Sequence, residues 1–273
     1  MKISKNKLNV VLDIGKTNVK LIFLKNDKIV KEYKTKQQNG SYRNSIKTLK
    51  SAKIIIWLIE KLKKESKKNI LENFVCTTHG CSLAFIGFDN KELIACTDYE
   101  YSFDKYKKEF LKVEPKFSTS FTPLLEGGLN TGLQIFYLSK KFPNVLKKTK
   151  YILSYPQYVA WKLSKTYSTE ITYVGCHSYL WDFKKNKYSQ LTKKLSVEKK
   201  FPPIKKAWDI IGDLKINNKK INILNGVHDS NASYLYFLKS NLKNFTLVST
   251  GTWYITLNQQ TSIKKLKPNY DML

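Results

Sequence analysis

Arginine is almost absent from this chain, although the chain is strongly basic. Arg43 is the only arginine among 49 Lys and Arg residues, and the formal net charge is +28. A charge of this size suggests nucleic-acid binding, but base readout and phosphate clamping favour the planar guanidinium group of arginine. The lysines are also spread from Lys2 to Lys267 rather than gathered in one block. We therefore expect solvated lysine faces, nonspecific attraction to polyanions in vitro, and no specific nucleic-acid partner.

Cysteine and histidine are scarce as well. The chain has four cysteines and three histidines, and no two cysteines have the CxxC spacing of zinc sites and dithiol redox sites. The cysteines are Cys76, Cys81, Cys96 and Cys176. We expect reduced, buried thiols and no metal site built from cysteine and histidine.

A long hydrophobic run is also missing. The longest strongly apolar run covers residues 54–59, which is far shorter than the ~20 residues that cross a bilayer as a helix. The region after Met1 is charged and lacks the apolar core of a signal peptide. These absences predict a soluble, cytoplasmic protein with no membrane partner.

Hydrophobic and aromatic residues are abundant enough for a core, because they make up 42% and 13% of the 273 residues. Apolar patterns predict strands at residues 8–13, 19–24 and 28–36, with Asn26-Asp27 as a hairpin turn. A helical stripe then predicts a helix over residues 45–64. The chain therefore opens as a β-meander that this helix covers.

The middle of the chain alternates strands, helices and loops. Two strands are predicted at 73–78 and 82–88, joined through His79-Gly80, where glycine permits a close backbone approach. Residues 98–126 are predicted to form a loop-rich insert, after which Asn130 can cap a helix to residue 141. Further predictions are a strand at 150–154, a helix from Pro156 to Leu163, an extended segment at 168–183 and a domain boundary near residue 219.

A short turn at residues 12–20 follows the first apolar strand and suits phosphate binding. Gly15 lets phosphate oxygens approach the backbone, Thr17 offers a hydroxyl and an amide, and Lys20 supplies charge. The turn is not a Walker A loop, because Val10 stands where that motif requires glycine. Taken alone, the segment could equally be a simple hairpin turn.

A second segment, residues 226–232, places Asp229 after a strand and at the start of a predicted helix. The helix dipole there favours an anion, and an aspartate at this point can accept a proton from a hydroxyl, as phosphoryl transfer requires. Residues 246–249 then form a strand that enters a second small turn at 250–252. The alternative interpretation is an N-cap beside a packed histidine.

Together these segments resemble the FGGY family of carbohydrate kinases, most closely its rhamnulokinase/fuculokinase-like branch. The resemblance implies an α/β fold: a ribonuclease-H-like domain of the actin-like ATPase superfamily and the start of a second, similar domain. We expect a sugar-binding N-terminal domain at 1–219 and the beginning of an ATP-binding domain at 220–273. The segments that carry the resemblance are Asp13–Asn18, Thr78–Gly80, Pro156–Trp161, Gly175–His177, His228–Ser230 and Thr250–Trp253.

The resemblance also implies roles for individual residues. Asp229 would be the general base that activates a hydroxyl of a keto-sugar or related polyol. ATP would be held by Asp13, Gly15, Lys16, Thr17, Asn18, Lys20, Gly251 and Thr252. The sugar would contact His79, Gly80, His228 and Ser230. Mg2+ would bridge the nucleotide, with Asp13 ordering its water shell.

The C-terminal end departs from the family pattern. Family members continue with a second domain about as large as the first, whereas this sequence ends at Leu273. We therefore expect a C-terminally truncated kinase, with a catalytically incompetent sugar- or nucleotide-binding fragment as the alternative. The sequence predicts no oligomeric state.

Overall fold

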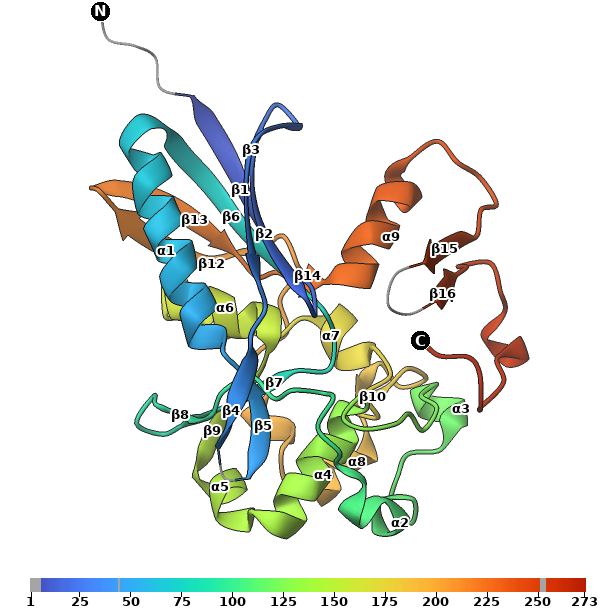
Figure 1. Cartoon of the computed structure of the whole chain (residues 1–273). Helices are drawn as coiled ribbons and strands as arrows, with labels where there is room; N and C mark the ends of the chain where they lie inside the picture. Colours follow the sequence, from blue (N-terminus) through green and yellow to red (C-terminus); the bar gives the residue numbers. More distant parts are fainter. Residues whose placement is uncertain (1–5, 44, 251–253) are drawn as a thin grey trace, which may run out of the picture.

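A seven-stranded mixed sheet forms the centre of the computed structural model, which describes residues 6–43, 45–250 and 254–273 (Figure 1). The strand order is β12-β13-β6-β1-β2-β3, and β14 also pairs with β6. The strands are β1 (Lys7–Ile14), β2 (Asn18–Lys25), β3 (Lys28–Lys36), β6 (Ile70–Thr78), β12 (Ile210–Ile216), β13 (Lys219–Leu224) and β14 (Val227–His228). Strands β1, β13 and β14 run parallel to β6. The mixed α/β fold class that the resemblance implied is confirmed.

The predicted β-meander is confirmed in β1, β2 and β3. Alternate residues of β1 are buried, so that one face of the strand meets the core. Asn26 and Asp27, between β2 and β3, both have positive φ angles, of 46° and 62°. These angles are typical of the tight turns that join antiparallel strands, and explain why the Asn-Asp signal identified the turn.

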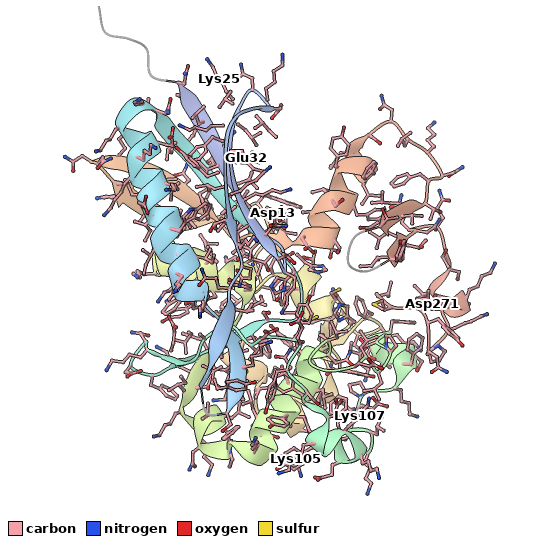
Figure 2. The ribbon with its side chains drawn as sticks, in the orientation of Figure 1. Asp13, Lys25, Glu32, Lys105, Lys107 and Asp271 are labelled. Carbon is pink, nitrogen blue, oxygen red and sulfur yellow. The ribbon has the colours of Figure 1, made fainter. Side chains whose placement is uncertain are left out.

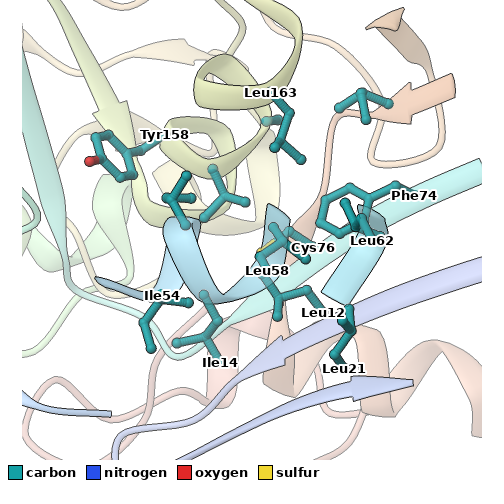
Figure 3. Packing of buried hydrophobic residues seen from close by; sticks show 14 of the residues in the cluster. Leu12, Ile14, Leu21, Ile54, Leu58, Leu62, Phe74, Cys76, Tyr158 and Leu163 are labelled. Atoms are coloured by element: carbon teal, nitrogen blue, oxygen red, sulfur yellow. The ribbon is translucent and has the colours of Figure 1, made fainter. Parts of the chain in front are cut away.

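Helix α1 (Ser51–Lys68) covers one face of the central sheet. Leu58 and Leu62 of this helix pack in the same cluster as Leu12 and Ile14 of β1 (Figure 3). The predicted start of this helix, at residue 45, is wrong. Residues 46–49 form β5 (Ile46–Leu49) instead, which pairs with β4 (Asn39–Arg43).

The reason for this difference is tertiary pairing. The amide of Leu49 donates to the carbonyl of Cys96 over 2.8 Å, and Thr48 forms a bridge with Thr97. Both partners are almost fifty residues away along the chain, so a periodic pattern within residues 45–64 could not reveal them.

A second group of elements builds the lower part of the molecule in Figure 1. Its sheet has the order β8-β7-β9. Its elements are β7 (Leu83–Gly87), β8 (Glu92–Ile94), α4 (Thr131–Lys141), α5 (Pro143–Lys148) and β9 (Thr149–Ser154). Helix α6 (Tyr155–Ser164) follows β9 and packs against the central sheet, in the same cluster as Leu12 and Leu58. The predicted strands at 82–88 and 150–154 and the predicted helix from Pro156 are confirmed. Asn130 precedes α4 as expected, but its side chain makes no cap: it binds the backbone of Pro123, Leu125 and His177.

Short elements complete the lower part, and most of them pack in the same cluster as β7 and α4. The insert at 98–126 contains η1 (Asp104–Tyr106), α2 (Lys107–Phe110) and α3 (Phe117–Ser120) and is loop-rich, as predicted. Residues 168–183 are not extended throughout, because α7 (Ile171–Gly175) forms there and is capped by the Glu170 carboxylate. The remaining elements are β10 (Trp181–Asp182), β11 (Lys187–Tyr188), α8 (Gln190–Lys194) and η2 (Glu198–Lys200).

The central sheet continues past residue 219. Because β13 pairs with β6 through residues 222–223, the domain boundary that we expected at 219/220 falls inside this sheet. The last segment contains α9 (Asp229–Lys239), β15 (Leu247–Thr250), β16 (Tyr254–Leu257) and η3 (Ile263–Lys265). It projects to one side of the sheet in Figure 1, and α9 has no residue buried by the described chain. Among the described residues, no helix has the length and apolarity needed to cross a membrane.

Candidate active site

Three parallel strands end at the same edge of the central sheet. In β1 and β6, Asp13 is opposite Thr77, and in β14 and β6, Val227 is opposite that same Thr77. The residues that follow these strands are the turn at 15–17, the pair at 79–80 and Asp229. This register brings the two sequence motifs, about 210 residues apart, to one place, where α/β proteins commonly bind ligands. Figure 2 shows Asp13 near the start of α9.

The first turn is a tight hairpin with an exposed tip. The Gly15 amide donates to the carbonyl of Asn18 over 2.9 Å, and the Gln37 amide donates to the carbonyl of Thr17 over 2.8 Å. Thr17 and Asn18 are exposed. A Cβ on Gly15 would lie 3.2 Å from the Asn18 carbonyl oxygen, so glycine allows the close turn. The tip can therefore approach an anion from the end of the sheet.

Asp13 lies between a cation and another carboxylate. Burial raises the pKa of Asp13, Lys20 opposes that rise from the facing position on β2, and the charge of Asp229 adds to it. The two carboxylates thus repel each other across the strand ends. A hard cation with oxygen ligands would relieve this repulsion, and hydrated Mg2+ suits such a donor set. Within the described ranges no three His, Cys, Asp or Glu side chains form a complete metal site.

Lys16 points away from the tip of the turn. Its ammonium group lies 2.5 Å from Asp98 Oδ1 and 3.3 Å from Glu100 Oε2. The Asp98 side chain is fully buried, and its other oxygen lies 3.1 Å from Lys47 Nζ. Burial by itself raises the pKa of Asp98, but the hydrogen bonds and charges of its partners, chiefly Lys16, lower it overall. Sequence reasoning missed Asp98, because nothing in its local pattern distinguishes it.

His79 forms a buried wall of the site. Its ring packs edge-on against Tyr99 and Tyr155, with centroid distances of 5.4 and 5.7 Å. Nδ1 lies 2.8 Å from the carbonyl of Gly80 and therefore donates its proton there. Burial lowers the pKa of His79, so the ring is neutral and its Nε2 is an acceptor. That buried Nε2 has no hydrogen-bond partner among the residues that the structure describes.

His228 lies next to Asp229 and is also buried. Its Nε2 is 3.3 Å from Asp229 Oδ1, and its Nδ1 is 2.7 Å from Asn231 Oδ1. Because both ring nitrogens face acceptors, the ring is an imidazolium. Burial opposes this charge, but Cys176, Asp229 and Asn231 outweigh burial and raise the pKa of His228 to about 9. A Cβ on Gly80 would lie 3.0 Å from His228 Nε2, so glycine leaves room for the ring.

The Asp229 carboxylate is held but accessible. Its Oδ1 accepts a hydrogen bond of 2.6 Å from the Ser230 amide, which is in the first turn of α9. The side chain keeps 35% of its surface exposed, whereas that of His228 keeps 8%. The carboxylate can therefore meet a hydroxyl group from solvent while one of its oxygens stays oriented by His228.

Residues distant in sequence support this pair. Sequence reasoning missed Glu170 and Thr172, and it included Gln157 only as part of the segment Pro156–Trp161, without a role. The His228 amide donates to the Thr172 hydroxyl over 3.3 Å, and the Thr172 amide donates to the Glu170 carboxylate over 2.9 Å. Gln157, which is fully buried, donates to the carbonyl of Asn225 over 2.8 Å. Their buried polar character could have drawn attention, but burial becomes evident only in the folded chain.

Two further expectations concern the cysteines and the second small turn. All four cysteines are free; Cys76, Cys81 and Cys96 are buried as expected, and Cys176 is partly buried. The expected phosphate contacts at Gly251 and Thr252 lie outside the described residues.

Comparison with known proteins relates this geometry to carbohydrate kinases. No family model and no curated protein sequence matches the chain. Among solved structures, a carbohydrate kinase from Novosphingobium aromaticivorans aligns with a TM-score of 0.87 and 26% identity over 96% of this chain and 58% of its own. Ligand-bound xylulose kinase from Lactobacillus acidophilus has a TM-score of 0.71 and 16% identity, over 84% of this chain and 49% of its own.

Plasmodium falciparum glycerol kinase with ADP has a TM-score of 0.69 and 15% identity, over 85% of this chain and 50% of its own. These neighbours are carbohydrate kinases of the FGGY type, and their fold is that of the actin-like ATPases. This chain spans about half to three fifths of their length. The chain therefore has the fold of FGGY-type sugar kinases over that part of their structure.

Proposed function

We propose that the chain is the sugar-binding part of a kinase that transfers a phosphoryl group from ATP to a hydroxyl of a sugar or polyol. The observation that carries this proposal is the shared end of β1, β6 and β14, which gathers Asp13, His79 and Asp229. Phosphoryl transfer needs an acceptor hydroxyl, a base and a phosphate site in one place. The similarity in fold to solved sugar kinases supports the same activity.

In this proposal Asp229 is the general base. The acceptor oxygen forms a bond to the γ-phosphorus, the bond between that phosphorus and the leaving ADP oxygen breaks, and the hydroxyl proton passes to the Asp229 carboxylate. The His228 imidazolium orients the carboxylate, because it lies 3.3 Å from Oδ1. His79 Nε2 and Gly80 would face the sugar, and Ser230 would border it.

The nucleotide phosphates would bind at the first turn and the second small turn. The residues assigned to this role are Asp13, Gly15, Lys16, Thr17, Asn18, Lys20, Gly251 and Thr252. Lys16 would contribute its backbone, since its side chain is paired with Asp98. Asp13 would order the water shell of a bound Mg2+, which would supply positive charge to the phosphates.

The finer assignments rest on the sequence motifs. The order His228-Asp229-Ser230 supports a keto-sugar substrate and the rhamnulokinase/fuculokinase-like branch. A need for ATP and four free thiols support a location in the cytoplasm. We propose that the sugar-binding part ends after β14 and that the ATP-binding part begins with α9, because β13 and β14 belong to the central sheet.

A second candidate function is binding of a sugar or nucleotide without turnover. It is favoured by the segment from α9 onward, in which Tyr236 and Tyr254 are 74% and 83% exposed and α9 has no residue buried by the described chain. Calorimetry with xylulose, rhamnulose and ADP separates the two candidates if it is run beside an assay for ADP release.

The decisive test is Asp229→Asn. We expect sugar-dependent ADP release by the parent chain, with ATP and Mg2+, to fall by at least about 100-fold when the base is removed. The matched control is Asp213→Asn, a partly exposed aspartate on β12 that pairs only with Lys220 in the described chain. Circular dichroism checks that both variants fold. Turnover that survives in Asp229→Asn would disprove the base assignment, and sugar binding without any turnover in the parent chain would favour the second candidate.

A further inference from the structure

The side chain of Lys16 leaves the phosphate turn and enters a buried cluster of charges. It is 14% exposed, and its Nζ lies 2.5 Å from Asp98 Oδ1 and 3.3 Å from Glu100 Oε2. A lysine that binds phosphate presents its ammonium group to the ligand as a point charge. The ammonium group of Lys16 already has two carboxylate partners, so it is not presented to a phosphate. The other contacts of this side chain indicate a different role.

Asp98 fixes the geometry of this cluster. Its side chain is completely buried, and it lies between Lys16 and Lys47, at 2.5 and 3.1 Å. Its Oδ1 also accepts the Glu100 amide over 3.1 Å, which closes the backbone around Tyr99. A buried carboxylate is costly unless it is paired and hydrogen-bonded. The cluster is therefore held in one arrangement as long as both lysines are in place.

Tyr99 connects the cluster to the wall of the sugar site. The Lys16 ammonium lies 4.5 Å from the centroid of the Tyr99 ring, within cation–π range. The Tyr99 ring also contacts His79: the two rings pack edge-on, with their centroids 5.4 Å apart. A continuous path of contacts thus runs from the phosphate turn, through Tyr99, to the imidazole.

The orientation of His79 matters because its Nε2 is a buried acceptor with no partner among the described residues. Nδ1 is committed to the Gly80 carbonyl at 2.8 Å, so Nε2 can only receive a hydrogen bond. A sugar or polyol hydroxyl is a suitable donor. A rotated ring would lose both this acceptor and the bond to Gly80.

We propose that Lys16 and Asp98 are positioning residues, which hold Tyr99 against His79 and so keep His79 Nε2 ready to accept a substrate hydroxyl. The proposal rests on the function proposed above. It adds that the side chain of Lys16 acts on sugar binding and not on nucleotide binding. A purely structural ion pair would instead change stability and affect both ligands alike.

A spectroscopic experiment tests the geometry without any activity. The chain has three histidines, so its imidazole Hε1 protons give three NMR signals, which His79→Gln assigns. With isotope labelling of the tyrosine rings, we expect a nuclear Overhauser contact between His79 and the Tyr99 ring. The loss of this contact in Tyr99→Phe identifies it. This contact should disappear in Lys16→Met and persist in Lys16→Arg. Persistence in Lys16→Met would overturn the proposal.

The matched control is Lys34→Met. Lys34 also forms an ion pair, at 2.8 Å from Glu32, but it is 68% exposed and belongs to β3. The contact between His79 and Tyr99 should be unchanged in this variant. Its loss there would mean that the contact responds to any lost charge, which would also overturn the proposal.

A binding experiment then separates sugar from nucleotide. Calorimetry with xylulose, and with glycerol as a second probe, should show about tenfold weaker binding in Lys16→Met, as expected for one misplaced hydrogen bond, and recovery in Lys16→Arg. Binding of ADP should change less than about twofold. Weaker ADP binding with unchanged sugar binding would overturn the proposal. If the parent chain binds neither probe, the proposed function fails, whereas the NMR contact still decides whether Lys16 positions His79.

Discussion

At the scale of single residues, the candidate site depends on two histidines, one neutral and one positively charged. His79 is neutral and offers an acceptor, whereas His228 is an imidazolium beside the Asp229 carboxylate. Both rings are buried, so their different neighbours decide the difference. His79 has a carbonyl on one side and aromatic rings around it, and His228 has an oxygen acceptor at each nitrogen.

The charge of His228 predicts how stability depends on pH. The pKa of His228 is about 9 in the folded chain, against 6.5 as its ordinary value. A raised pKa means that the stabilisation is complete below about pH 6.5 and is lost as the pH rises through about 9. We expect this contribution to be about 3 kcal/mol. Urea unfolding of the parent chain and of His228→Gln should therefore show a stability difference that shrinks between these pH values.

Cys176 provides the control for this prediction. It is the first of the groups that raise the pKa of His228, ahead of Asp229 and Asn231. In Cys176→Ser the loss of stability should still begin near pH 6.5, but it should be smaller and be complete at a lower pH, because only the pKa of His228 in the folded chain is lowered. A stability difference between the parent chain and His228→Gln that is constant from pH 6 to pH 10 would contradict the imidazolium.

At the scale of elements, the junction between β13 and β14 delivers Asp229 to the site. Gly226 has a φ of +87°, and a Cβ there would lie 2.6 Å from the carbonyl oxygen of Cys76 and 3.0 Å from Cβ of Pro156. Asn225, fully buried, binds the backbone of Thr169 and Lys205 through its amide group. The chain thus makes a close turn against β6 just before His228.

Gly226→Ala should therefore destabilise the chain by about 2–4 kcal/mol, because the new methyl group meets backbone atoms at a left-handed position. The control is Gly175→Ala in α7, whose Cβ would meet only the edge of the Phe183 ring, at 3.2 Å, without a positive φ. Chemical denaturation of both variants measures the effect. Equal stability losses in the two variants would contradict the importance of this junction.

The elements also show how much of the fold could be predicted from local sequence patterns. Strands β1, β2, β3, β6, β7 and β9 were predicted because each carries its own apolar pattern between turn signals. The start of α1 was misplaced, and α7 was missed. Residues 46–49 are a strand because they pair with residues near Cys96, and α7 is a short helix that depends on its Glu170 cap. The partner of residues 46–49 is distant in sequence, and α7 is too short, at five residues, to show a helical period.

At the scale of the whole molecule, the charge of +28 is distributed rather than focused. Lys25 lies at one end of the molecule, and Lys105 and Lys107 lie at the other (Figure 2). Several lysines near the candidate site are paired with carboxylates, such as Lys16 and Lys47 with Asp98. Such a surface attracts polyanions from many directions.

This distribution predicts weak, salt-sensitive binding to DNA. A duplex of mixed sequence should bind in low salt and be released by about 0.2 M salt, because such binding comes from counterion release alone. Fluorescence anisotropy with two unrelated duplexes should give the same affinity for both. Sequence-selective binding that survives at physiological salt would contradict this prediction and revive a nucleic-acid function.

The sequence by itself suggested the chemistry that we propose for the two motifs, because a small turn after an apolar strand and an aspartate at a helix start are local features. It also determined the early strands and their hairpin at Asn26-Asp27. Only the tertiary structure decided how these parts meet. The pairing of β14 with β6 brings Asp229 beside Asp13, and Lys16 turns toward Asp98, 82 residues away. Such contacts depend on burial and strand register, which join residues whose separation along the chain carries no signal of their proximity.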